Sequence, residues 1–204
     1  MTRRHLLAAF SALAARGLLR AGGAKLEHPD GSELVGKAAP PLRLTRWLNS
    51  PPLEIGHGDL RDKVVLLRWW TAGCPLCAAT APALIGFQQR YQSQGLRIVG
   101  VYHPKPDPGD VDLKSVKAAI AEKQFKFPVA VDADWSALKR WWLSTDRDFT
   151  SVSFLLDRRG VIRYVHPGGE FHEGNEGGFD THESCNRDYH VIEGDIRRLV
   201  AQRA

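Results

Sequence analysis

The chain has 204 residues, 43% of them hydrophobic, which suits one domain with extensions rather than two full domains. Its formal charge of +5 would fit a nucleic-acid-binding protein, but Arg3, Arg4, Arg16 and Arg20 all lie in the first 24 residues, which contain no acid. Without these four, 24 basic residues face 23 acidic ones, so no nucleic-acid partner is expected. Three cysteines cannot all pair within one chain, which excludes a disulfide scaffold.

The first 24 residues have a charged start, an apolar middle and a small-residue end, an order typical of a secretory signal. Thr2-Arg3-Arg4-His5 followed by two leucines also loosely resembles a twin-arginine export signal. Arg16 and Arg20 interrupt the apolar part, and an N-terminal amphipathic helix is the alternative. We expect an exported, periplasmic protein, or otherwise a cytoplasmic one with this helix. No apolar run approaches the ~20 residues of a membrane span, so no integral span is expected.

Hydrophobic patterns predict the elements of the first half. Residues 42–48 alternate apolar and polar side chains as a strand does, and residues 63–69 are apolar and β-branched enough for a buried strand. Apolar residues at helical spacing follow over 75–93, where Gln94-Gly95 marks the helix end, and 96–102 reads as the next strand. This strand–helix–strand order predicts parallel pairing.

The second half begins with a proline-rich loop. Beyond it the patterns predict a helix at 112–124, a strand at 128–132, a helix at 134–143, a hairpin of strands at 152–157 and 161–165, and a last helix from 189 to about 201. Residues 167–187 show neither the helical nor the strand period of apolar residues. A connection of this length is unusual inside a compact domain. We predict a loop insertion there, with borders at 166–190.

The chemically distinctive stretch is Cys74-Pro75-Leu76-Cys77, where the strand hands over to the helix. Cys74 would lie at or just before the helix N-terminus, where unpaired N–H groups and the helix dipole favour a thiolate. Cys77 follows within the first turn, and Pro75 suits a helix start because its missing N–H would have no partner there. Ala78 follows the pair where c-type haem attachment needs histidine, and no second cysteine pair completes a zinc site. We predict a redox site without an organic cofactor.

Four stretches together carry a family likeness: Leu34-Val35-Gly36-Lys37-Ala38-Ala39-Pro40, Asp59-Leu60-Arg61-Asp62-Lys63-Val64-Val65, the Trp-containing Cys-x-x-Cys, and Phe154-Leu155-Leu156-Asp157-Arg158-Arg159-Gly160-Val161-Ile162. They resemble the redoxin/TlpA-type (ResA-like) thiol–disulfide oxidoreductases of the thioredoxin superfamily. The resemblance implies an α/β, thioredoxin-like domain at 34–204, with a central mixed β-sheet flanked by helices and an N-terminal β extension. The His/Gly-rich C-terminal insertion would be an addition to it. In such proteins the first cysteine, here Cys74, attacks a disulfide and the second, Cys77, resolves it.

The loop that would face the cysteines departs from this family, which usually has a cis-proline there. Ser151 stands at that place in Phe149-Thr150-Ser151-Val152. A non-proline cis bond costs ~3 kcal/mol, so we expect a trans bond between Thr150 and Ser151. We treat both residues as a substrate loop whose hydroxyls lie near the sulfurs.

Arg68 is a second departure, because the family likeness would place an acid or a polar amide six residues before the first cysteine. A guanidinium near the sulfurs would favour the thiolate. The alternative is a structural ion pair with an acid such as Asp132 or Asp157. The other residues expected to support the pair or tune its pKa are Trp70, Thr71 and Pro75.

The 166–190 window contains four of the eight histidines and the third cysteine. A candidate ligand set for zinc or another transition metal is His172, His182, Cys185 and His190. A solvated loop is one alternative, because the window is rich in glycine, and a substrate-gating or third-thiol role is another.

The leading functional hypothesis is a thiol–disulfide oxidoreductase that cycles Cys74 and Cys77 between dithiol and disulfide. Its partners would be disulfide-containing proteins or small thiols, with an upstream reductant or oxidant that the sequence does not identify. One alternative is a redoxin-type thiol peroxidase, in which Cys74 becomes a sulfenic acid; Thr71, three residues earlier, favours it weakly. The other is a non-enzymatic redox or metal-binding module that uses the 166–190 loop.

Overall fold

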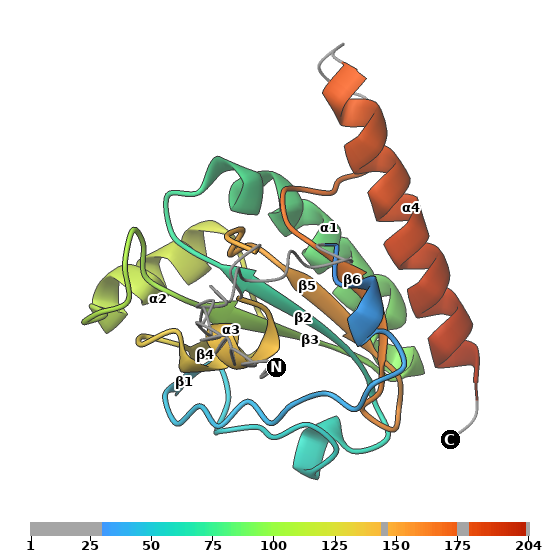
Figure 1. The fold of residues 1–204 in the computed structure, drawn as a ribbon, viewed down its shortest axis with the longest axis horizontal. Helices are drawn as coiled ribbons and strands as arrows, with labels where there is room; N and C mark the ends of the chain where they lie inside the picture. Colours follow the sequence, from blue (N-terminus) through green and yellow to red (C-terminus); the bar gives the residue numbers. More distant parts are fainter. Residues whose placement is uncertain (1–29, 144–146, 175–179, 203–204) are drawn as a thin grey trace, which may run out of the picture.

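A computed structural model of the chain describes residues 30–143, 147–174 and 180–202. The leader at 1–24 lies outside these residues. Six strands form one sheet in the order β1-β4-β3-β2-β5-β6, with helices on both faces (Figure 1). The strands and α-helices are β1 (Trp47–Leu48), β2 (Val64–Trp70), α1 (Pro75–Tyr91), β3 (Leu96–Tyr102), α2 (Leu113–Glu122), β4 (Val129–Val131), α3 (Ser136–Trp141), β5 (Ser153–Leu156), β6 (Ile162–His166) and α4 (Asp180–Ala201).

The sheet is mixed, and β2 lies near its centre. β2 pairs parallel with β3 and antiparallel with β5, while β3 pairs parallel with β4. The edge strands β1 and β6 pair antiparallel with β4 and β5. The predicted central mixed sheet flanked by helices is therefore confirmed, and the two strand–helix–strand units are parallel as their order requires.

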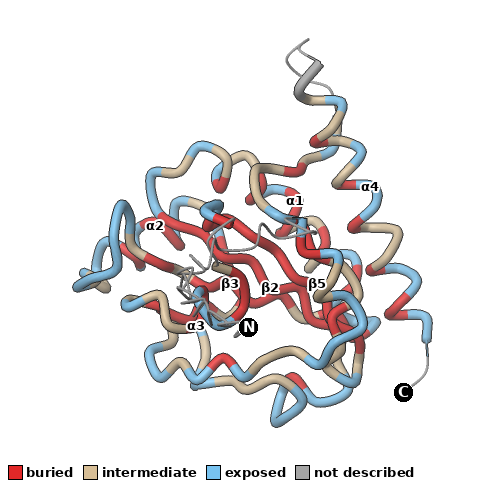
Figure 2. The backbone as a smooth tube through the Cα atoms, viewed as in Figure 1, coloured by how far each residue is buried: buried red, intermediate tan, exposed pale blue. Residues whose placement is uncertain are grey.

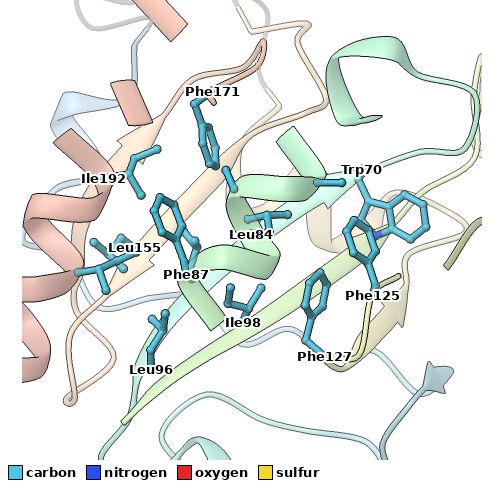
Figure 3. Close-up of a cluster of buried hydrophobic side chains, with 14 of the residues drawn as sticks. Trp70, Leu84, Phe87, Leu96, Ile98, Phe125, Phe127, Leu155, Phe171 and Ile192 are labelled. Atoms are coloured by element: carbon cyan, nitrogen blue, oxygen red, sulfur yellow. The ribbon is translucent and has the colours of Figure 1, made fainter. Parts of the chain in front are cut away.

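Alternating side chains of β2 separate two apolar clusters. Val64, Leu66 and Trp70 lie in a cluster with side chains of α1, α2 and α4. The intervening Val65 and Leu67 lie in a second cluster with α3 and the segment before β2. β2 is buried along its whole length (Figure 2). Figure 3 shows side chains of the first cluster. A strand buried on both faces is expected to be continuously apolar. Arg68, a charged residue inside β2, is an exception to this expectation.

The structure corrects two predicted boundaries. The strand expected over 42–48 is regular only at β1, because Arg43 adopts a left-handed backbone conformation (φ 53°) that interrupts an extended run. The N-terminal β extension is thus limited to β1 and an isolated bridge between Ala38 and Val161.

The last helix begins at Asp180 instead of Tyr189, so the C-terminal part of the predicted insertion is helical. Its buried residues Cys185, Tyr189, Ile192, Ile196 and Leu199 recur every three or four positions. This spacing is the signal of an amphipathic helix that packs on the core. In the described parts of the chain, no helix is long and apolar enough to cross a membrane.

Candidate active site

The two cysteines lie at the junction of β2 and α1, at the end of the central strand. Gly73 makes the turn between the strand and the helix in a left-handed conformation (φ 72°), which glycine adopts without a steric penalty. Cys74 is the N-cap of α1, and Pro75 occupies the first turn. The backbone N–H of Cys77 donates to Cys74 Sγ over 3.4 Å. The sulfur of Cys74 therefore takes the place of a capping oxygen at the helix N-terminus.

The two thiols have different surroundings. Cys74 is partly exposed, whereas Cys77 is buried at 3% exposure. Partial burial opposes ionisation of Cys74, but hydrogen bonds from the Cys77 thiol and backbone and from the Ser151 hydroxyl together lower its pKa. Burial raises the pKa of Cys77, against the opposing effect of the Arg68 charge. The accessible thiol is thus the one that ionises more readily, as a nucleophile requires.

The loop before β5 brings one hydroxyl group, that of Ser151, to the cysteines. Ser151 Oγ lies 3.3 Å from Cys77 Sγ. The bond between Thr150 and Ser151 is trans, as the absence of proline predicts. Thr150 is buried next to it, and its hydroxyl has no hydrogen-bond partner among the described residues. A side-chain hydroxyl thus contacts the buried sulfur from this loop.

Arg68 is buried in the middle of β2, at 1% exposure, on the α1 side of the sheet. Its guanidinium donates to Ser153 Oγ over 3.1 Å and to the Gly169 carbonyl over 2.7 Å. Burial lowers the pKa of Arg68, while the charges of Cys77 and Cys74 oppose this shift. Arginine remains protonated in proteins, so a positive charge lies behind the cysteine pair.

The alternative role for Arg68, an ion pair with Asp132 or Asp157, is not what the structure shows. Asp132 accepts hydrogen bonds from the N–H groups of Ala137 and Leu138 at the start of α3. Asp157 pairs with Arg163 over 2.6 Å. Among the described residues, no carboxylate forms an ion pair with Arg68.

Besides Ser153 of β5, the groups that contact Arg68 lie in the segment after β6, where the sequence patterns indicated no such role. The Gly169 carbonyl accepts from the guanidinium, and Arg68 Cζ lies 5.6 Å from the ring centroid of Phe171. His166 is buried nearby, with Nε2 3.4 Å from Asp188. Nothing in the spacing of these residues indicates a contact with β2.

Replacing Arg68 with methionine is expected to raise the pKa of Cys77 further, because the cation that opposes the burial effect is removed. Below that pKa, each unit of rise reduces the thiolate fraction of Cys77 about tenfold. Attack on the mixed disulfide slows by a smaller factor, because a more basic thiolate is a stronger nucleophile. The thiolate ultraviolet absorbance, followed against pH, measures the change. Arg163→Met is the matched control, because this guanidinium pairs with Asp157. An unaltered Cys77 titration in Arg68→Met would limit Arg68 to a structural role.

Trp70 and Thr71 support the junction from the end of β2. Trp70 is buried and packs edge-on against Tyr102 and Phe125, each with ring centroids 5.3 Å away. Thr71 is buried, and a hydrogen bond from its backbone to the Cys77 sulfur helps to limit the rise in that thiol's pKa. Through these contacts the two residues support the β2–α1 junction that bears the cysteines.

His103 is a further neighbour that the sequence patterns did not reveal. It follows β3, its backbone N–H donates to the Trp70 carbonyl over 3.0 Å, and its ring packs edge-on against Trp135. The side chain is fully buried, and burial lowers its pKa to about 4. The imidazole is therefore neutral at physiological pH.

Acid is expected to destabilise the protein through His103. Its folded pKa of about 4 lies below the ordinary value of 6.5, so its stabilising contribution is complete above the ordinary value and is lost as the pH falls towards 4. The loss is about 3 kcal/mol by pH 4. Denaturant unfolding of the native protein and His103→Gln at pH 7 and pH 4 measures it. His57→Gln, at an exposed position, is the control; an equal acid effect in native and His103→Gln proteins would contradict the assignment.

The predicted metal ligands are only partly brought together. Potential ligand atoms of Glu170, His172 and Cys185 lie within 4.8 Å of one another. Glu170 was not in the predicted ligand set. His182 Nδ1 lies 3.1 Å from His172 Nε2. His190 is exposed, packs edge-on against Tyr189 and lies outside this group.

Comparisons with known proteins identify the family of the chain. A family model described as Redoxin matches residues 34–181. Thiol-disulfide oxidoreductase YkuV of Bacillus subtilis is 28% identical over 146 residues, covering 71% of this chain and 87% of YkuV. Thiol:disulfide interchange protein DsbE of Xylella fastidiosa is 31% identical over 143 residues, covering 69% of this chain and 64% of DsbE.

Protein DipZ of Mycobacterium tuberculosis is 28% identical over 195 residues, covering 90% of this chain but 24% of DipZ. The chain thus spans about a quarter of that relative. Among solved structures, a putative thiol:disulfide interchange protein DsbE from Chlorobium tepidum has a TM-score of 0.62 at 20% identity, with 82% of this chain and 98% of that chain covered. At this identity the likeness concerns the fold.

Proposed function

Because the chain belongs to the Redoxin family, we propose that it is a thiol–disulfide oxidoreductase that cycles Cys74 and Cys77 between dithiol and disulfide. One observation carries this proposal. The partly exposed thiol at the helix N-cap has the lowered pKa, and the buried thiol one turn later has the raised pKa. This asymmetry separates a nucleophile from a resolving thiol.

The proposed reaction has two exchange steps. Cys74 thiolate attacks one sulfur of a partner disulfide, a mixed disulfide forms, and the other partner sulfur leaves as a thiolate. Cys77 then loses its proton and attacks Cys74 Sγ, which releases the second partner thiol. The partner gains two electrons and two protons while the pair becomes a disulfide. Run in reverse, the same steps oxidise a partner dithiol.

Partner access would come from the side of Cys74. A groove of ≈ 470 Å³ lies between α1 and the end of α2, lined by Ala78, Ala81, Pro82, Ile85, Gly86, Gln89, Glu122, Lys123 and Gln124. Ala78 lies four residues after Cys74, hence on the same side of the helix. We propose a disulfide-containing protein or a small disulfide as the substrate that approaches here.

Reduction of insulin disulfides by the purified, pre-reduced protein tests the proposal. A stoichiometric loss of the two thiols with each substrate disulfide reduced is the expected result. The same preparation mixed with hydrogen peroxide tests the thiol-peroxidase alternative, since a peroxidase would consume peroxide faster than it reduces insulin. Preferential peroxide consumption would overturn the proposed substrate class.

We also propose that the protein is exported, with a signal-like order of charged, apolar and small residues at 1–24 as support. Cell fractionation followed by N-terminal sequencing tests this. Export predicts a shortened chain outside the cytoplasm that begins near residue 24. A cytoplasmic chain with an intact N-terminus would support the alternative of an N-terminal helix.

A further inference from the structure

Four side chains with metal-ligating atoms converge between the segment that follows β6 and the start of α4. Glu170 and His172 come from the segment, and His182 and Cys185 come from the helix, where a spacing of three places them on one face. Atoms of Glu170, His172 and Cys185 lie within 4.8 Å of one another, and the His182 and His172 nitrogens are 3.1 Å apart. The group joins the segment after β6 to the helix that follows it in the chain.

Two of the ligand–ligand separations lie close to those of a tetrahedral site. With zinc–nitrogen bonds of about 2.0–2.1 Å, two bound nitrogens lie about 3.3 Å apart, and a bound sulfur and oxygen lie about 3.6 Å apart. The two histidine nitrogens are 3.1 Å apart, and Cys185 Sγ lies 3.8 Å from Glu170 Oε1. These two separations thus need a change of only a few tenths of an ångström, and His182, which contacts His172, would move towards Cys185 and Glu170 to complete the set.

The backbone already holds the two sides together. The His172 N–H donates to the Cys185 carbonyl over 3.4 Å, and the Gly174 N–H donates to Asn186 Oδ1 over 2.9 Å. Phe171, between the two ligands of the segment, is fully buried and stacks on Phe87 of α1. The ligand-bearing segment is therefore positioned by contacts other than those among the ligands.

The chemistry of the group also suits a cation. Cys185 is buried, and its Sγ lies 3.8 Å from Glu170 Oε1. A divalent ion would neutralise a thiolate and a carboxylate together, and two neutral imidazoles would complete the coordination. A set of one sulfur, two nitrogens and one oxygen is of the borderline-soft type that zinc binds.

We propose that Glu170, His172, His182 and Cys185 bind one divalent transition-metal ion of the zinc class. Four protein ligands leave no open position, so the ion is structural and fastens the segment to α4. The same segment presents the Gly169 carbonyl to Arg68. The metal ion therefore stabilises the segment whose Gly169 carbonyl positions the Arg68 guanidinium near the cysteine pair.

Cobalt(II) binding to the full chain, after treatment with a chelator, tests the site. The experiment uses a Cys74→Ser/Cys77→Ser background, so that Cys185 is the sole thiolate and the result does not depend on the redox proposal. We expect one equivalent of cobalt with a thiolate-to-cobalt charge-transfer band. Zinc should displace the cobalt and raise the thermal unfolding midpoint.

In the same background, Cys185→Ser should abolish the charge-transfer band, and His172→Ala and His182→Ala should each weaken binding at least tenfold. Glu170→Gln keeps the shape of the side chain and should also weaken binding. His190→Ala is the matched control, because this histidine is exposed on the same helix outside the group. The proposal is overturned by a band that survives Cys185→Ser, by equal binding in His172→Ala, or by no thiolate band in the folded parent protein.

Discussion

Replacing Cys74 with serine is expected to reduce the rate of disulfide exchange to less than about 1% of the native rate. The nucleophile in this exchange is a thiolate, and a serine hydroxyl stays protonated at neutral pH and does not replace it. The structure gives this thiol the helix N-cap, the partly exposed position and the hydrogen bonds that lower its pKa. The rate of insulin reduction by pre-reduced protein measures the loss. Full activity in Cys74→Ser would refute the mechanism.

Cys77→Ser is the matched comparison, since it removes the second thiol of the pair, keeps Cys74 and leaves a hydroxyl in place of the thiol that donates to Cys74. Attack by Cys74 should still occur, but resolution should fail, because the introduced serine has no thiol to release the partner. A stable mixed disulfide between Cys74 and the substrate should then accumulate, and a gel without reductant followed by mass spectrometry detects it. Absence of such an adduct from Cys77→Ser, together with a loss of activity, would contradict the assigned order of attack.

Phe171→Ala is expected to lower the free energy of unfolding by about 3–5 kcal/mol, the usual range for a fully buried phenylalanine. Its ring is 0% exposed, stacks on Phe87 with a centroid separation of 6.3 Å, and packs edge-on against His166 (Figure 3). The truncation removes the anchor of the segment that presents Gly169 to Arg68. Chemical denaturation followed by tryptophan fluorescence measures the change.

Phe149→Ala is the control for this substitution. Its side chain is 54% exposed and lies near Gly168, on the same segment. The expected loss is below about 1 kcal/mol, because little apolar surface is buried there. If the two variants lost equal stability, or if Phe171→Ala lost less than this control, the segment would not be anchored by its buried ring.

The local elements of the site were accessible from the sequence because short-range physics specifies them. A β-branched apolar run, a glycine turn and a proline at a helix start predict the order β2, Cys74, α1 without knowledge of any distant residue. The mixed sheet followed from the order of elements and the family likeness. The order of strand, cysteine and helix depends on residues within about one turn or one strand of each other, whereas the mixed sheet pairs residues far apart in the chain.

Two predicted element boundaries were wrong, the strand at 42–48 and the start of the last helix. The left-handed Arg43 leaves the alternation at 42–48 unchanged but ends regular pairing, so the sequence period did not reveal it. The early start of α4 had a signal, since Cys185, Tyr189 and Ile192 have helical spacing. The many glycines and polar residues before Tyr189 obscured it.

The sequence by itself determined the dithiol, its place at a helix N-terminus and the trans bond before Ser151, because each depends on neighbouring residues alone. Only the tertiary structure decided what surrounds the dithiol. Arg68 meets Gly169, 101 positions later, and Ser151 meets Cys77, 74 positions earlier. Such contacts depend on how the sheet and helices pack. Contacts between distant segments produce no hydrophobic period in the sequence, so no pattern predicts them.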